Sequence, residues 1–105
     1  MDKILDIFKS AQVEARQYAF KTIGKDVMIY PCGFAWVYVK LRKNNPFGKQ
    51  LESIGFQWDV FRKHYCYWVG EYNQSCSHKE AHAEKLAELL TKEFGMKFYH
   101  SSRLD

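Results

Sequence analysis

The 105-residue sequence has only three cysteines and two prolines, and its hydrophobic runs are short. Cys32, Cys66 and Cys76 are too few, and odd in number, for a disulfide framework, so we expect them to be reduced thiols. The longest apolar run, 32–39, is far shorter than the roughly 18 residues that a membrane-spanning helix needs. Residues 1–6 include two acids where a secretory signal has a basic stretch and an apolar core. We therefore expect a cytoplasmic protein with no membrane partner.

The composition that remains is that of one folded domain. Hydrophobic residues make up 47% of the chain and charged residues 27%, a balance typical of a small globular protein. The sequence contains no internal repeat and no low-complexity linker. These features exclude a disordered tail and a multidomain enzyme, and we treat residues 1–105 as a single domain.

The net charge of +4 is modest, but its distribution is uneven. Residues 1–39 carry a net charge of +1, and residues 65–105 carry −1. The stretch 40–64 holds the whole excess of +4. Such a local concentration of cations can contact phosphates, although a solvated surface has the same composition. The basic residues of this stretch are Lys40, Arg42, Lys43, Lys49, Arg62 and Lys63.

Hydrophobic periodicity and turn residues predict seven secondary-structure elements. Apolar residues at helical spacing, among them Ile4, Phe8, Ala11 and Ala15, predict a helix over 3–22. β-Branched and aromatic residues predict a long strand over 27–41. Asn45-Pro46 predicts the start of a helix at 46–54, and two strand-like runs, 58–61 and 65–69, predict a hairpin. The capping box Ser77–Glu80 predicts a helix at 78–94. A short strand at 97–100 follows it.

The order of these elements predicts an α+β fold. Residues 27–100 match the ferredoxin-like, split βαβ arrangement, in which an antiparallel sheet carries two helices on one face. The additional N-terminal helix, 1–24, is then free to cover the other face of the sheet. We expect this second covering because the strand at 27–41 is apolar on both faces, and a strand covered twice loses its polar alternation.

An aromatic stripe of Phe34, Trp36 and Tyr38 occupies one face of that strand. On an open sheet face these rings could stack nucleic-acid bases, while nearby Lys40 and Arg42 could hold phosphates. The alternative is that the N-terminal helix buries the stripe, because an amphipathic helix must cover an apolar surface. We expect the second arrangement.

Metal and enzyme patterns are weak in this sequence. Cys76, His78 and His82 form a local cluster with metal-ligand chemistry, and a zinc site there would need a fourth group such as His64 or Cys66. The spacing matches no paired Cys-x-x-Cys motif, so we predict no metal and no cofactor.

The sequence also shows no carboxylate pair, no phosphate-binding glycine loop and no serine motif. Cys32 could serve as a nucleophile beside a histidine, but at a strand start between Pro31 and Gly33 we expect the thiol to be buried and inert. We therefore expect the protein not to be an enzyme.

Three parts of the chain carry a resemblance to a known group of proteins: PCGFAWV at 31–37, YNQS at 72–75 with KEA at 79–81, and SSRLD at 101–105. From about residue 30 to the C-terminus the chain resembles small accessory proteins encoded by tailed bacteriophages. The resemblance implies a phage origin and a bacterial host cell, and it transfers no catalytic residues. The aromatic hairpin at 55–68 is similar to hairpins in some phage and plasmid DNA-processing proteins.

Two binding functions follow from these patterns. The first is docking on a host protein, as in host takeover or in inhibition of a host defence with an anti-CRISPR-like role. The alternative is nucleic-acid or nucleotide binding through the basic segments 40–49 and 62–64 and the sheet aromatics. The residues expected at the interface in both cases are Lys40, Arg42, Lys43, Lys49, Arg62, Lys63, Tyr65 and Tyr67.

Overall fold

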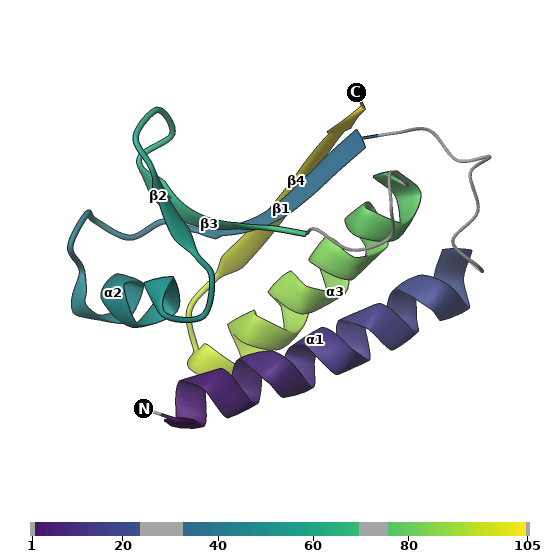
Figure 1. Ribbon diagram of the computed structural model, residues 1–105, viewed down its shortest axis with the longest axis horizontal. Coiled ribbons are helices and arrows are strands. Elements are labelled where there is room, and N and C mark those ends of the chain that lie inside the picture. Colours follow the sequence, from purple (N-terminus) through teal and green to yellow (C-terminus); the bar gives the residue numbers. More distant parts are fainter. Residues whose placement is uncertain (1, 24–32, 70–75, 105) are drawn as a thin grey trace.

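A computed structural model describes residues 2–23, 33–69 and 76–104 and shows an α+β fold with an antiparallel sheet (Figure 1). The elements are α1 (Asp2–Ile23), β1 (Gly33–Val39), α2 (Pro46–Glu52), β2 (Gln57–Asp59), β3 (His64–Trp68), α3 (Cys76–Phe94) and β4 (Phe98–Leu104). The four strands lie in the order β2-β3-β1-β4, and every neighbouring pair is antiparallel. The predicted sequence of helices and strands is therefore confirmed over the described residues.

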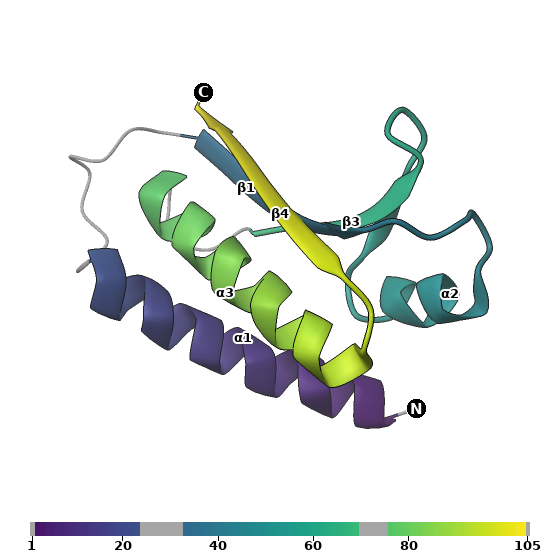
Figure 2. The same ribbon diagram turned by 180° about the vertical axis from the view of Figure 1, so that it is seen from behind.

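The position of α1 differs from the prediction. We expected this helix to cover the second face of the sheet, but α1 lies alongside α3, and both helices are on the same side of the sheet (Figure 1 and Figure 2). Ala35, Val37 and Val39 point toward this side and are buried. Phe34, Trp36 and Tyr38 alternate with them and face the opposite way. The prediction that α1 buries the aromatic stripe is therefore wrong.

Side-chain size explains where α1 packs. Its buried face consists mainly of Ala11, Ala15 and Ala19, which allow a close approach to another helix but offer little surface to cover large rings. Its N-terminal half also reaches β3, where the Phe8 ring lies 5.1 Å from the Tyr67 ring. α3 covers β1 and β4. α1 packs along α3 and reaches β3 at Tyr67, through Phe8 and Gln12.

Several element boundaries differ from the prediction, most of all that of β4. β4 extends to Leu104 because it pairs with β1 over its full length, from Val39↔Phe98 to Gly33↔Leu104. α3 begins at Cys76, so Ser77 lies inside the helix and not at its N-cap, and its side chain is outside the described residues. The predicted start of the first strand, 27–32, also lies outside them.

The short helix α2 begins as predicted. The Asn45 side chain accepts hydrogen bonds from the backbone N–H groups of Phe47 and Gly48, at 2.8 and 3.2 Å. Gly48 is required here because a Cβ at this position would overlap the ring of Tyr65. α2 is therefore seated directly against β3.

Candidate nucleic-acid interface

A groove of about 610 Å³ lies between the loop that follows β1 and the turn that joins β2 to β3. Lys40, Leu41, Arg42 and Lys43 line one side, and the β2–β3 segment lines the other. No acidic side chain is among the described residues that line it. The groove therefore combines four cations with an apolar wall, and its lining from the β2–β3 segment consists of Trp58, Val60 and Lys63.

The loop that carries the first three cations is held in place by Tyr65. The Tyr65 hydroxyl accepts a hydrogen bond of 3.0 Å from the backbone N–H of Asn44, which adopts the left-handed conformation at φ 66°. The loop then closes with a bond of 3.0 Å from the N–H of Asn45 to the carbonyl of Arg42. These contacts order the basic loop before any ligand arrives.

The turn between β2 and β3 is organised by Asp59. Its Oδ1 accepts from the N–H groups of Phe61 and Arg62 at 2.9 and 3.0 Å, and its Oδ2 accepts from the Arg62 guanidinium at 3.0 Å. The hydrogen bond to the Arg62 N–H, above all, lowers the pKa of the Asp59 carboxyl. On the turn that these hydrogen bonds hold, the side chain of Phe61 projects into solvent with 91% of its surface exposed.

On the outer face of the sheet, three rings stand in a row across β3, β1 and β4. The rings of Tyr38 and His64 have centroids 4.4 Å apart, and those of Tyr38 and Tyr99 are 5.2 Å apart, both nearly parallel. The ammonium of Lys40 lies 5.1 Å from the Tyr99 ring. The faces of these rings are therefore occupied within the protein itself.

Trp36 lies next to this row and is also covered. Only 6% of its surface is exposed because the Trp68 ring lies 4.8 Å away and the Arg62 guanidinium 5.4 Å away. Trp36 is thus covered by β3 and the turn, and not by α1 as we predicted for the stripe. Trp68 keeps 41% of its surface exposed.

A second hollow of about 370 Å³ adjoins the groove and shares Lys40 with it. Its lining includes Trp36, Tyr38, Arg62 and His64. Four of the basic residues predicted from the sequence, Lys40, Arg42, Lys43 and Lys63, therefore meet in one groove, and Arg62 lines the hollow beside it.

Three other predicted interface residues lie elsewhere. Lys49 is on α2, where its ammonium is 3.7 Å from the Glu52 carboxylate. Tyr65 has no exposed surface, because its side chain points from β3 toward the helices and the core. It therefore cannot contact a partner directly. Its role is to position the basic loop through the hydrogen bond to Asn44. Tyr67 faces α1 and accepts a hydrogen bond of 2.7 Å from Gln12.

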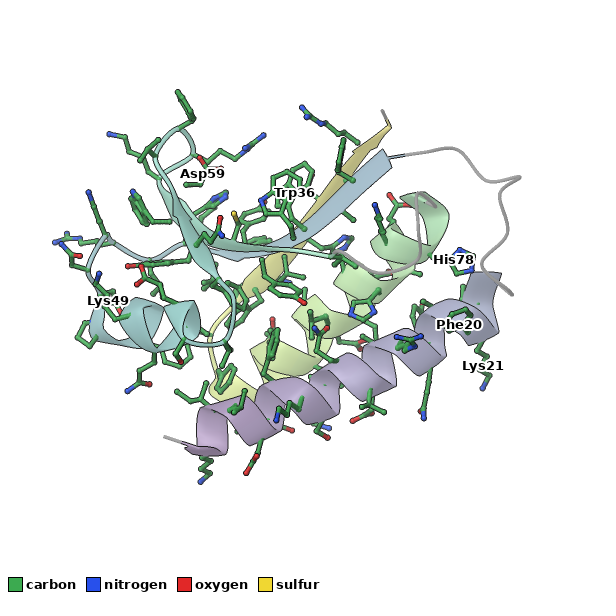
Figure 3. The ribbon with its side chains drawn as sticks, viewed as in Figure 1. Phe20, Lys21, Trp36, Lys49, Asp59 and His78 are labelled. Atoms are coloured by element: carbon green, nitrogen blue, oxygen red, sulfur yellow. The ribbon has the colours of Figure 1, made fainter. Side chains whose placement is uncertain are left out.

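His78 and His82, of the candidate metal cluster that we did not favour, do not converge with His64 and Cys66, the possible fourth ligands. His78 and His82 are buried on α3, below the sheet, where the His78 ring lies 5.6 Å from Phe20 and His82 Nε2 is 2.6 Å from Gln12 Oε1. His64 and Cys66 lie on the outer face of β3. Figure 3 shows the resulting separation between His78, near the end of α1, and Asp59, at the β2–β3 turn. The side chain of Cys76 is outside the described residues.

Sequence reasoning missed Trp58, Val60 and Phe61 as candidate ligand contacts. Their only sequence signal is an apolar run, Trp58 to Phe61, next to a basic turn, which reads as an ordinary strand. The structure ends β2 at Asp59, so the last two residues of the run fall in the turn and are exposed.

Comparison with known proteins gives no match: no family model, curated protein or solved structure is significantly similar to this chain. Within the described residues, no helix has the length and apolar character required to span a bilayer.

Proposed function

We propose that this protein binds single-stranded nucleic acid in the groove between the β1–α2 loop and the β2–β3 turn. The observation that carries the proposal is the meeting of Lys40, Arg42 and Lys43 with Lys63 around an apolar wall. Cations that track a phosphate backbone beside aromatic rings are the usual construction of single-strand binding surfaces. The volume of the groove is also in the range of sites that hold a nucleotide-sized ligand.

The charge of the groove supports a phosphate-bearing ligand. Four cations face the same space, and the described lining contains no carboxylate that would neutralise them. Asp59 lies nearby, but its carboxylate is engaged by Phe61, Arg62 and the turn backbone. A phosphodiester entering the groove would therefore meet uncompensated positive charge.

The available aromatic surface favours a single strand over a duplex. The rings of the outer face stack on one another, whereas Phe61 projects beside the groove and Trp58 lines it. Such rings can stack only on bases that are not already stacked in a double helix. We therefore expect unpaired strands to bind more tightly than duplexes of the same length.

Fluorescence anisotropy with labelled single-stranded and double-stranded oligonucleotides, each at two salt concentrations, tests the proposal. The test variant is Lys40→Glu/Arg42→Glu/Lys43→Glu. We expect it to bind at least about tenfold more weakly and to lower the salt slope of the binding constant by about 2, because three phosphate contacts are lost.

The matched control is Lys9→Glu/Lys21→Glu/Lys92→Glu, which changes the net charge by the same amount at exposed positions on α1 and α3. We expect its affinity to stay close to that of the wild type. Equal loss in the two variants would show a response to net charge alone and would contradict a site in the groove. The absence of salt-sensitive binding by the wild type would overturn the proposal.

Docking on a host protein is a second candidate, supported by the exposed apolar side chains Val60, Phe61 and Trp68. Exposed aromatic residues are typical anchors of protein interfaces. Under this proposal the chain is a non-enzymatic accessory protein of a tailed phage, as the resemblance implies. Affinity capture from a bacterial lysate, with and without nuclease treatment, tests it. A stoichiometric protein partner that resists nuclease and is lost with Phe61→Ala supports docking. Captured proteins that disappear after nuclease treatment favour nucleic-acid binding in the groove.

We also infer that residues 33–104 follow the ferredoxin-like, split βαβ topology. The order of elements, strand-helix-strand-strand-helix-strand, and the sheet order β4-β1-β3-β2 support this inference. An experimental structure that places α2 and α3 on opposite faces of the sheet would contradict it.

A further inference from the structure

Three potential metal ligands meet on the outer face of the sheet, separate from the groove. Asp59 and His64 are direct partners across β2 and β3, and Cys66 follows His64 on the same face of β3. One oxygen of Asp59, one ring nitrogen of His64 and Sγ of Cys66 all lie within 4.8 Å of one another. We propose that these three side chains bind a zinc ion.

His64 supplies an independent observation that points to a ligand. Its side chain is buried, with 5% of its surface exposed, and among the described residues its Nε2 has no hydrogen-bond partner. A buried polar atom without a partner raises the free energy of the folded state. Coordination of a metal ion by the imidazole is one way to satisfy it, since neutral histidine is a common zinc ligand.

The three ligand atoms need only a small movement to reach zinc. Ligands at about 2.0 to 2.3 Å from a tetrahedral ion are about 3.3 to 3.7 Å from each other. The present separations are all within 4.8 Å, so a shift of about 1 Å is enough to bring the ligand atoms to these values. Tyr38 limits the movement of His64 because the two rings are stacked 4.4 Å apart.

Asp59 is oriented in the way that metal-binding carboxylates usually are. Its three hydrogen bonds, from two backbone N–H groups and the Arg62 guanidinium, fix the direction of the carboxylate. An ionised carboxylate has about four lone-pair sites, so one remains for a metal. Arg62 can therefore keep its hydrogen bond to Asp59 while Asp59 binds the zinc ion, and it helps to orient this carboxylate.

Zinc binding at this site releases one proton, from Cys66. Burial raises the pKa of the Cys66 thiol, so the thiol is protonated at neutral pH before binding. Zinc binding forms the Zn–S bond, breaks the S–H bond and releases the proton to solvent. The thiolate and the carboxylate then offset the two positive charges of the ion, while Arg62 and Lys40 remain as nearby cations.

Three protein ligands leave a fourth position of a tetrahedral ion for water or an exogenous ligand. His64 also lines the hollow that adjoins the groove, whereas Asp59 and Cys66 are not among the residues that line it. The site therefore differs from a structural zinc centre, in which four protein ligands surround the ion. This proposal does not depend on nucleic-acid binding in the groove.

Titration of the untagged, reduced, metal-free full-length chain with Co²⁺ tests the proposal. We expect a thiolate-to-cobalt charge-transfer band that saturates at one equivalent and disappears when Zn²⁺ is added. Cys66→Ser and His64→Gln are expected to abolish the band and to weaken Zn²⁺ binding by more than about 100-fold, since loss of an outer partner alone weakens binding by 10- to 100-fold.

Cys76→Ser and His78→Gln are the matched controls, because they remove a thiol and an imidazole from the other candidate cluster. Circular dichroism checks that every variant folds. If Cys66→Ser does not fold, the wild type is alkylated in the presence and absence of Zn²⁺, and the modified cysteines are identified by mass spectrometry. We expect Zn²⁺ to slow the alkylation of Cys66 and of no other cysteine. The proposal is overturned if the wild type gives no band with excess Co²⁺, if a control variant loses the band, or if Zn²⁺ protects another cysteine instead.

Discussion

At the scale of single residues, Phe61 offers the clearest separation of binding from stability. Its ring is almost fully exposed at the β2–β3 turn, and its backbone N–H is bonded to Asp59. The side chain therefore contributes little to folding and is free to stack on a base.

Phe61→Ala is expected to weaken single-strand binding by about 1–3 kcal/mol, the usual contribution of one base–aromatic stack. The urea midpoint of unfolding should stay unchanged. Anisotropy titrations and denaturation curves on the same protein preparations measure both quantities. Unchanged affinity would show that bases do not contact the turn.

Tyr65 acts through the loop that it holds. Its hydroxyl bonds the N–H of Asn44, and its ring packs against Gly48 at the base of α2. Tyr65→Phe keeps the ring and removes only this hydrogen bond. We expect the free energy of unfolding to fall by about 1 kcal/mol.

The same substitution should also weaken oligonucleotide binding, because the basic loop at Lys40–Lys43 loses part of its order before binding. Tyr18→Phe is the matched control, since it removes a phenol hydroxyl from a half-buried ring on α1, outside this loop. Lowered stability with unchanged binding would contradict the positioning role of Tyr65 and leave only its structural one.

At the scale of elements, the contact between α1 and α3 depends on small side chains. Ala15 has no exposed surface, and Ala83 and Ala87 on α3 are equally buried. Helices that approach closely through alanine cannot accept a larger residue without moving apart.

Ala15→Leu is therefore expected to lower the free energy of unfolding by about 1–3 kcal/mol through overpacking. Val13→Leu provides the comparison on the same helix, because Val13 is 56% exposed and a larger side chain there can extend into solvent. Urea denaturation of both variants gives the two values. Equal stability would contradict the close packing of α1 on α3.

At the scale of the whole molecule, a buried polar chain ties three elements together. Gln12 on α1 donates to the Tyr67 hydroxyl on β3, and its Oε1 lies 2.6 Å from Nε2 of His82 on α3. Burial, and to a lesser extent the positive charge of Arg16, lowers the pKa of His82 to about 4. Protonation of His82 therefore opposes folding.

The unfolded chain takes up this proton near pH 6.5 and the folded protein only near pH 4, so stability is complete above pH 6.5 and is lost as the pH falls toward 4. We expect the wild type to lose about 2 kcal/mol between pH 7.5 and pH 5. His82→Gln should remove most of this loss. His100→Gln, at an exposed position on β4, should retain it.

Urea denaturation at the two pH values gives the comparison. The contribution of His64, whose pKa burial also lowers, remains in both variants. A loss of stability in His82→Gln as large as that of the wild type would show that another group controls acid unfolding.

The sequence by itself determined the helices and strands, because their signals are local. Apolar spacing, the Asn45 cap and the change to β-branched and aromatic residues each act within a few positions. The concentration of charge at 40–64 was equally visible, and four of its cations do meet in the groove.

Only the tertiary structure decided what α1 covers and which side chains face solvent. The hydrophobic effect is non-directional, so an amphipathic helix can pack against a sheet face or against another helix. For α1 the partner depended on how its small alanine side chains fit against α3 and against the aromatic side chains of the sheet. Asp59, His64 and Cys66 likewise came together through strand register, which pairs Asp59 with His64 across the hairpin. Register places side chains on a shared face through backbone hydrogen bonds between strands, and no local pattern in the sequence specifies those bonds.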